Sequence, residues 1–161
     1  MGGDMKQLLE ASTEQRSKLG ELYIDSEGNH YRYMVADGAV NKNELYDYSP
    51  INWEVNDQLD STVNPANEDM ASACVWLGTA STVADGEYAW FFVGPGKFSV
   101  KVDGAISSKS IVYVDTVAGH VTATANATLL RGVTPLNGFS ASLGDVEDFY
   151  ATIPLYAVDL P

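Results

Sequence analysis

Apolar and polar positions alternate in short runs from residue 20 to the end of the chain, and turn residues separate the runs. Residues 21–24 and 30–35, with an Asp-, Glu- and Gly-containing connection between them, predict a β-hairpin. In the second strand, alternation puts Tyr31 and Tyr33 on one face and the residues between and beyond them on the other. Runs of this length, with almost no helical period, predict an all-β fold, a small antiparallel β-barrel or sandwich.

The remaining strands are predicted in the same way, from apolar runs between turn signals. They are 71–79, 88–93, 98–102, 111–114, 121–124 and 149–160. We predict hairpin turns at Asp103-Gly104 and at residues 118–120. Because proline cannot donate a hydrogen bond to a ladder, Pro154 places the last run at a sheet edge or a bulge.

Residues 1–19 have a different pattern from the rest of the chain. A capping box that begins at Asp4 and a glycine stop at Gly20 predict a helix of about 15 residues. Its apolar stripe, which contains Leu8 and Leu9, is too narrow for a helix that is stable in water alone. Two interpretations stay open: a frayed terminus, or a helical or extended N-terminal arm that docks on a neighbouring subunit.

The predicted β-domain, residues 20–161, contains one long segment with weak periodicity. Residues 41–65 are rich in Asn, Asp, Tyr and Ser, which predicts a partly ordered excursion. One predicted strand is apolar on both faces, because Trp90 and Phe92 point one way and Phe91 points the other. Such a strand needs a cover on each side, which either the excursion or another protein subunit would supply.

Composition and net charge argue against several classes of partner and site. The 161 residues include 22 acidic and 9 basic side chains, a net charge of −13. Without clustered Lys and Arg, we expect neither a nucleic-acid partner nor an anionic membrane surface. No apolar run has membrane-spanning length. A single cysteine, Cys74, excludes an intramolecular disulfide, and two histidines leave few ligands, so we expect no metal and no cofactor.

A search for catalytic motifs predicts no enzyme and no catalytic residue. Residues 94–97 lack the first glycine of a phosphate loop and the hydroxyl residue after its lysine. His30 and His120 lie in or near turns, and no serine occupies a nucleophile elbow. The acidic runs 68–69 and 145–148 lack the spacing of a calcium loop, so we interpret them as solvated surface.

Four segments then suggest a family. Residues 20–45 hold an Asp–Gly–Tyr–Arg–Tyr hairpin, and 85–95 hold a glycine-then-tryptophan strand that ends in Gly-Pro. Residues 98–104 contain Val-Lys-Val-Asp-Gly, and 118–121 contain an Ala-Gly turn. In this order the segments resemble the capsid decoration proteins of tailed bacteriophages, also called head auxiliary or cement proteins. The polar excursion and the tail from Arg131 have no counterpart in that pattern.

The resemblance implies a β-tulip-like barrel without catalytic residues. It implies a structural protein of the virion that binds the outer surface of the capsid. There it would join neighbouring subunits of the major capsid protein against the pressure of packaged DNA, and would act as a homo-oligomer, a trimer or a dimer. The candidates for contact with the capsid or another subunit are Leu8, Leu9, Trp90, Phe91 and Phe92, the three aromatic residues also serving the barrel core.

Three alternatives stay open. The first is a phage fibre or knob, or a carbohydrate-binding β-module, in which Tyr46, Tyr48 and Trp53 of the polar excursion would stack on sugar rings. The second is a small hydrolase that uses carboxylates on a β-scaffold. The third is a cellular structural β-domain unrelated to viruses.

Overall fold

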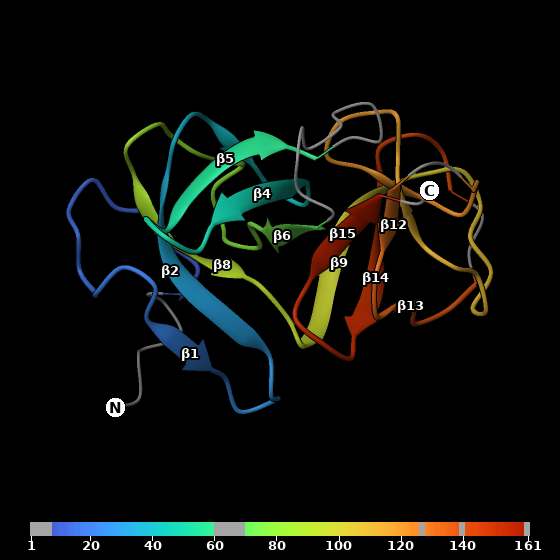
Figure 1. Cartoon of the computed structure of the whole chain (residues 1–161), viewed down its shortest axis with the longest axis horizontal. Helices are drawn as coiled ribbons and strands as arrows, with labels where there is room; N and C mark the ends of the chain where they lie inside the picture. Colours follow the sequence, from blue (N-terminus) through green and yellow to red (C-terminus); the bar gives the residue numbers. More distant parts are fainter. Residues whose placement is uncertain (1–7, 60–69, 126–127, 139–140, 160–161) are drawn as a thin grey trace.

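The computed structural model describes residues 8–59, 70–125, 128–138 and 141–159, and these residues form an all-β fold (Figure 1). The strands of the N-terminal half are β1 (Leu22–Ile24), β2 (His30–Ala36), β3 (Val40–Asn41), β4 (Leu45–Ser49), β5 (Glu54–Gln58), β6 (Met70–Val75), β7 (Thr82–Val83) and β8 (Tyr88–Phe92). Those of the C-terminal half are β9 (Gly96–Asp103), β10 (Tyr113–Val114), β11 (Val121–Thr122), β12 (Thr128–Leu130), β13 (Val133–Pro135), β14 (Asp145–Ala151) and β15 (Tyr156–Asp159).

Five strands close into a barrel, as the sequence predicted. Strand β2 pairs with β5, then β4, β6 and β8 follow, and β8 pairs with β2 to complete the circle. The β2–β5 pair is parallel and the other pairs are antiparallel. Strand β1 extends this sheet at its edge, and the predicted hairpin between β1 and β2 is confirmed.

Strands β9–β15 form a second unit, which we call the C-terminal lobe and which lies beside the barrel in Figure 1. Its strands follow the order β15-β12-β10-β11-β9-β14-β13. Strand β15 also pairs with β6, so one sheet continues from the barrel into the lobe. The predicted hairpin at residues 118–120 is confirmed as the β10–β11 connection.

Strand β8 is a wall between two apolar cores. Phe91 packs inside the barrel with residues such as Met34 and Trp76. Phe92 packs on the other side, where its ring stacks on Phe98 of β9 with 5.0 Å between ring centroids. Both apolar faces of this strand are therefore covered by the chain itself.

Part of the cover for Phe91 comes from the segment predicted as a polar excursion. Residues 41–59 are ordered, and they supply β4 and β5, from which Tyr46 and Val55 point into the barrel core. The sequence did not predict strand β5, because Val55 is its single fully buried residue and one apolar residue gives no visible alternation. Residues 60–69 lie outside the described residues.

The predicted N-terminal helix is not found in residues 9–19. This segment instead runs along the barrel, where Ser12 and Tyr88 exchange backbone hydrogen bonds of 2.9 and 2.8 Å. The Leu9 carbonyl accepts a bond of 2.9 Å from the Thr79 N–H. These tertiary bonds outweigh helix propensity, which is a weak preference. The capping-box residue Asp4 lies outside the described residues.

Two predictions about the C-terminal half are also wrong. Residues 149–160 are not one edge strand, because Pro154 separates β14 from β15, and each of these strands has neighbours on both sides. The turn at Asp103-Gly104 does not make a hairpin, since β9 pairs with β14 and β11 instead of β10. Strands β12 and β13, of three residues each, were not predicted from the sequence.

Gly20 allows a test of how the N-terminal segment meets the barrel. Its φ is 78°, and a Cβ there would lie 2.2 Å from Cε2 of Trp53. Gly28 has a similar φ of 84°, but its Cβ would meet nothing within 4 Å. Both alanine variants should lose about 1 kcal/mol to the left-handed backbone. Only Gly20→Ala should lose about 1–3 kcal/mol more through overpacking.

Urea unfolding of the two variants measures this difference directly. Equal losses for Gly20→Ala and Gly28→Ala would contradict the close approach of Gly20 to the indole.

Candidate functional site

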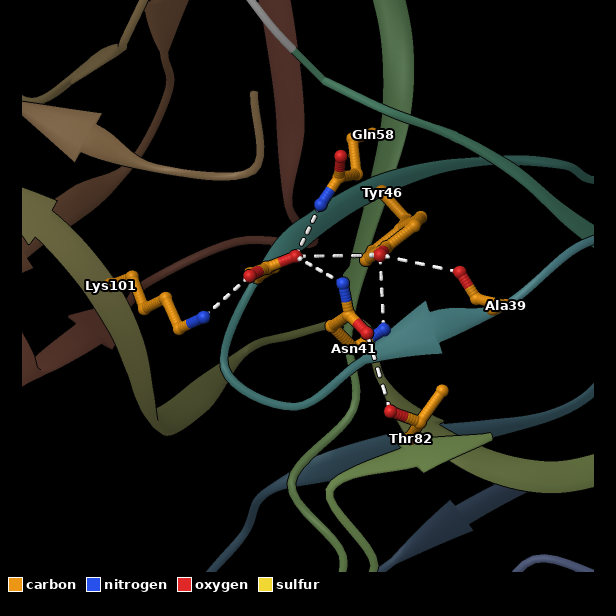
Figure 2. A network of polar contacts seen from close by, with 7 residues as sticks. Ala39, Asn41, Tyr46, Gln58, Thr82 and Lys101 are labelled. Atoms are coloured by element: carbon orange, nitrogen blue, oxygen red, sulfur yellow. Dashed lines mark hydrogen bonds and ion pairs between the residues drawn. The ribbon is translucent and has the colours of Figure 1, made fainter. Parts of the chain in front are cut away.

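A buried carboxylate accepts hydrogen bonds from residues of the barrel side and from β9 of the C-terminal lobe; Figure 2 labels its partners Asn41, Tyr46, Gln58 and Lys101. Glu44 is 6% exposed, and its Oε1 accepts an ion-paired hydrogen bond of 2.5 Å from Nζ of Lys101 on β9. Its Oε2 accepts from Asn41 Nδ2 at 3.1 Å, from the Tyr46 hydroxyl at 3.4 Å and from Gln58 Nε2. We call these five residues the Glu44 cluster.

The turn that carries Glu44 is shaped by its neighbour Asn43. Asn43 has a φ of 61°, a left-handed conformation that asparagine tolerates better than most residues. Its carbonyl accepts a bond of 2.7 Å from the Lys101 N–H, and its side-chain amide donates to the Ser99 carbonyl at 3.0 Å. The Leu45 N–H donates to the Gly119 carbonyl at 2.8 Å. The turn is thus attached to β9 and to the β10–β11 hairpin.

The environment of Glu44 keeps it ionised. Burial alone raises the pKa of the carboxyl, but hydrogen bonds from Lys101 and Asn41 and the charge of Lys101 outweigh it, so the pKa is lowered from its ordinary value. Both oxygens of the carboxylate accept hydrogen bonds from side chains of the Glu44 cluster. Its chemistry is that of a structural tie between the barrel and the lobe.

His120 and Asp115 add titratable groups beside the Glu44 cluster. Both are buried, and Nδ1 of His120 and Oδ2 of Asp115 have no hydrogen-bond partner in the described structure. Burial lowers the pKa of His120 below 6.5; the Lys101 charge adds to this shift, whereas Glu44 and nearby aspartates oppose it. The imidazole is therefore neutral near pH 7.

The five residues predicted for capsid or subunit contact do not form one surface. Leu8 and Trp90 pack together with Tyr33 on the outside of the barrel, beneath the N-terminal segment. Phe91 is inside the barrel and Phe92 faces the C-terminal lobe. Leu9 alone is exposed, while its backbone carbonyl bonds to Thr79.

The rings suggested for sugar stacking are in contact with their own chain. Tyr46 is buried in the barrel core, and its hydroxyl belongs to the Glu44 cluster. Tyr48 stacks on Trp53 with 6.2 Å between centroids, and the Arg32 guanidinium lies 5.2 Å from the indole centroid. Trp53 also has an unusual φ of 60°, which fixes this arrangement at the cost of backbone strain.

Lys97 and Asp148, which lie in two of the segments considered for chemistry, form an ion pair with each other. Lys97 follows the turn between β8 and β9, where its N–H donates to Asn29 Oδ1 at 2.7 Å. Its Nζ pairs with Asp148 at 2.9 Å on the surface. Residues 68–69 lie outside the described residues. Within the described part of the chain, no three His, Cys, Asp or Glu side chains are grouped to hold a metal ion.

Sequence reasoning missed an exposed apolar edge at β1. Leu22 is 43% exposed and Ile24 50% exposed, whereas Tyr23 between them turns inward and contacts Trp90 with 5.9 Å between centroids. Strand β1 pairs with β2 alone among the described strands. The alternation Leu–Tyr–Ile contained this signal, but the sequence does not tell which face is covered.

Comparison with known proteins adds no relative: no family model, no curated protein and no solved structure matches this chain. The described residues also contain no helix of the length and apolar character needed to cross a membrane.

A substitution that removes the Glu44 charge tests how much the Glu44–Lys101 ion pair between the barrel and the lobe contributes to stability. Glu44→Gln keeps the shape of the side chain but leaves the Lys101 ammonium, about a third exposed, without its partner. We expect it to lower the free energy of unfolding by about 2 kcal/mol. Asp148→Asn, at the half-exposed pair with Lys97, is the matched control and should cost less than about 1 kcal/mol. Urea unfolding measures both, and equal costs would contradict the assignment.

His120 predicts an acid-sensitive step. Its folded pKa lies below 6.5, so the unfolded state binds more protons and the free energy of unfolding falls as pH drops below 6.5. The loss ends below the folded pKa, and Glu44 adds a second loss at pH values below 4.5. His120→Gln should remove the first loss and keep the second. The free energies of unfolding of the unmodified protein and of His120→Gln, measured from pH 8 down to about pH 3, test this. The same slope near pH 6 in both proteins would refute it.

Proposed function

We propose that this protein is a non-enzymatic structural protein of a tailed-phage virion. In this proposal it binds the outer surface of the capsid and joins neighbouring subunits of the major capsid protein. The observation that carries the proposal is the β1 edge, where Leu22 and Ile24 are exposed on a strand that pairs with β2 alone among the described strands. The edge offers both an apolar contact and backbone groups to an incoming chain.

The positions in the fold of the segments that resemble the decoration proteins support the same proposal. The Asp–Gly–Tyr–Arg–Tyr hairpin is β1–β2, and the glycine-then-tryptophan segment contains β8. The Val-Lys-Val-Asp-Gly segment forms the end of β9, and the Ala-Gly turn joins β10 to β11. The resembling segments are therefore the framework of the barrel and of its contact with the lobe.

The proposed attachment is strand addition at β1. Glu21 accepts from the Tyr33 N–H at 3.0 Å and Asp25 donates to the Asn29 carbonyl at 3.0 Å, so these residues face β2. Alternation then directs the backbone groups of Leu22 and Ile24 away from β2. An extended coat segment would pair with them and cover their side chains. Full burial of one such side chain contributes about 1.5–3 kcal/mol.

Binding of this kind stabilises the assembled shell by mass action, because the protein binds neighbouring subunits only when they are assembled. A trimer or dimer of this chain would present several β1 edges to different coat subunits, which raises the combined affinity. The net charge of −13 fits a position outside the shell, away from packaged DNA.

No contact in the described residues favours the carbohydrate-binding alternative, since the rings of Tyr46, Tyr48 and Trp53 already contact this chain. A hydrolase would need a carboxylate that reaches a substrate, whereas Glu44 is engaged by four side chains.

Substitution at the β1 edge tests the proposal. Ile24→Asp should weaken sedimentation of the protein with mature capsids at least about tenfold, a loss of about 1.4 kcal/mol, while leaving the free energy of unfolding nearly unchanged. Ile51→Asp is the matched control, because Ile51 is 92% exposed in the β4–β5 turn. Equal binding by the two variants would exclude β1 as the attachment edge.

The copy number in purified virus particles, measured by quantitative mass spectrometry, tests the role itself. A ratio near that of the major capsid protein is expected. A few copies per particle would support a fibre component instead, and absence from particles would overturn the proposal.

A further inference from the structure

The C-terminal lobe has an open groove of about 360 Å³ that the proposed function does not use. Residues 109–112 form one wall, and the β12–β13 hairpin, residues 129–134, forms the other. The volume lies near the lower end of the range of small-molecule sites.

The groove differs from the rest of the molecule in its charge. Lys109 and Arg131 line it and are exposed, and its lining contains no acidic residue. The whole chain has 22 acidic and only 9 basic side chains, so two cations without a carboxylate form a local exception. Neither cation takes part in the ion pairs found within the described residues, Lys97–Asp148 and Lys101–Glu44. Both charges are available to an anionic ligand.

The groove also has an apolar wall and a strand edge. Ile111 is 60% exposed beside Lys109, which leaves an aliphatic surface for a ligand to cover. Within the part of the chain that the structure describes, strand β13 ends the strand order and pairs with β14 alone. The Gly132 carbonyl and the Leu136 N–H bond toward β14, at 2.9 and 3.1 Å. Alternation then directs the N–H and C=O of Val133 away from β14, where an extended chain would pair.

We propose that this groove binds an extended acidic peptide segment of another protein. Its carboxylates would pair with Lys109 and Arg131, an adjacent aliphatic side chain would cover Ile111, and its backbone would bond to the edge of β13. An acidic polysaccharide fits less well, because no aromatic ring lines the groove to stack on a sugar. The site lies on strands other than β1 and is independent of the capsid proposal.

A fluorescent peptide of alternating valine and glutamate is a direct probe. Its binding to the full chain is measured by anisotropy at 150 mM salt, where the screening length of about 8 Å suppresses repulsion by distant carboxylates. Arg131→Gln and Lys109→Gln should each weaken binding about tenfold, which corresponds to about 1.4 kcal/mol. Lys18→Gln, an exposed cation outside the groove, is the matched control and should leave binding unchanged.

Three further probes make the test specific. The valine–glutamine analogue should lose binding, since it has no carboxylates. A peptide with N-methyl groups on one edge should also bind more weakly if it adds to β13. Amide shifts in NMR spectra should change at residues 109–112 and 129–134. Failure of the acidic peptide to bind, equal binding by Lys18→Gln and Arg131→Gln, or binding of a sulfated oligosaccharide but not the peptide would each overturn the proposal.

Discussion

The carboxylate of Glu44 has to be matched by donors from both halves of the molecule, and the joint between the barrel and the C-terminal lobe is built around this requirement. Asn41, Tyr46 and Gln58 approach from the barrel side, and Lys101 approaches from β9. A buried ion pair contributes little net stability compared with apolar packing, but separating its partners is costly. Such a pair therefore fixes position: the lobe fits the barrel in the one arrangement that brings Lys101 to Glu44.

Apolar packing supplies the rest of that joint. Strand β8 places Phe91 in the barrel core and Phe92 in the core shared with the lobe. A shift of β8 that disturbs the packing of one core therefore disturbs the packing of the other. The Phe92–Phe98–Phe149 row, with centroid distances of 5.0 and 5.9 Å, continues the packing across the lobe. Both interactions stabilise the contact between the barrel and the C-terminal lobe. The hydrogen bonds and ion pair of Glu44 depend on the direction of approach, whereas the aromatic packing at β8 contributes through the apolar area that it buries.

Local patterns predicted the elements better than their partners. The β1–β2 and β10–β11 hairpins follow from short-range turn chemistry, and the two-sided apolar strand at 90–92 correctly indicated a double cover. Non-local pairing was beyond reach: neither the parallel β9–β11 pair nor the insertion of β15 beside β6 leaves a signature in adjacent residues. The Glu44 cluster was missed for the same reason, since Glu44 and Lys101 are 57 positions apart and each looks like an ordinary surface charge. The exposed β1 edge and the cationic groove depend on which faces remain uncovered, and only the assembled fold decides that.

The place of β15 has a consequence for how the protein is made. The barrel strands β2 to β8 emerge from the ribosome first, but β15, which bridges β6 and β12, is the last of the described strands to be synthesised. Until it arrives, β6 and β12 both lack a neighbour, and unpaired strand edges recruit other chains. A nascent or prematurely released chain that contains β12 but not yet β15 therefore exposes two unpaired strand edges, and cells that produce this protein at a high rate would need chaperones that cover them.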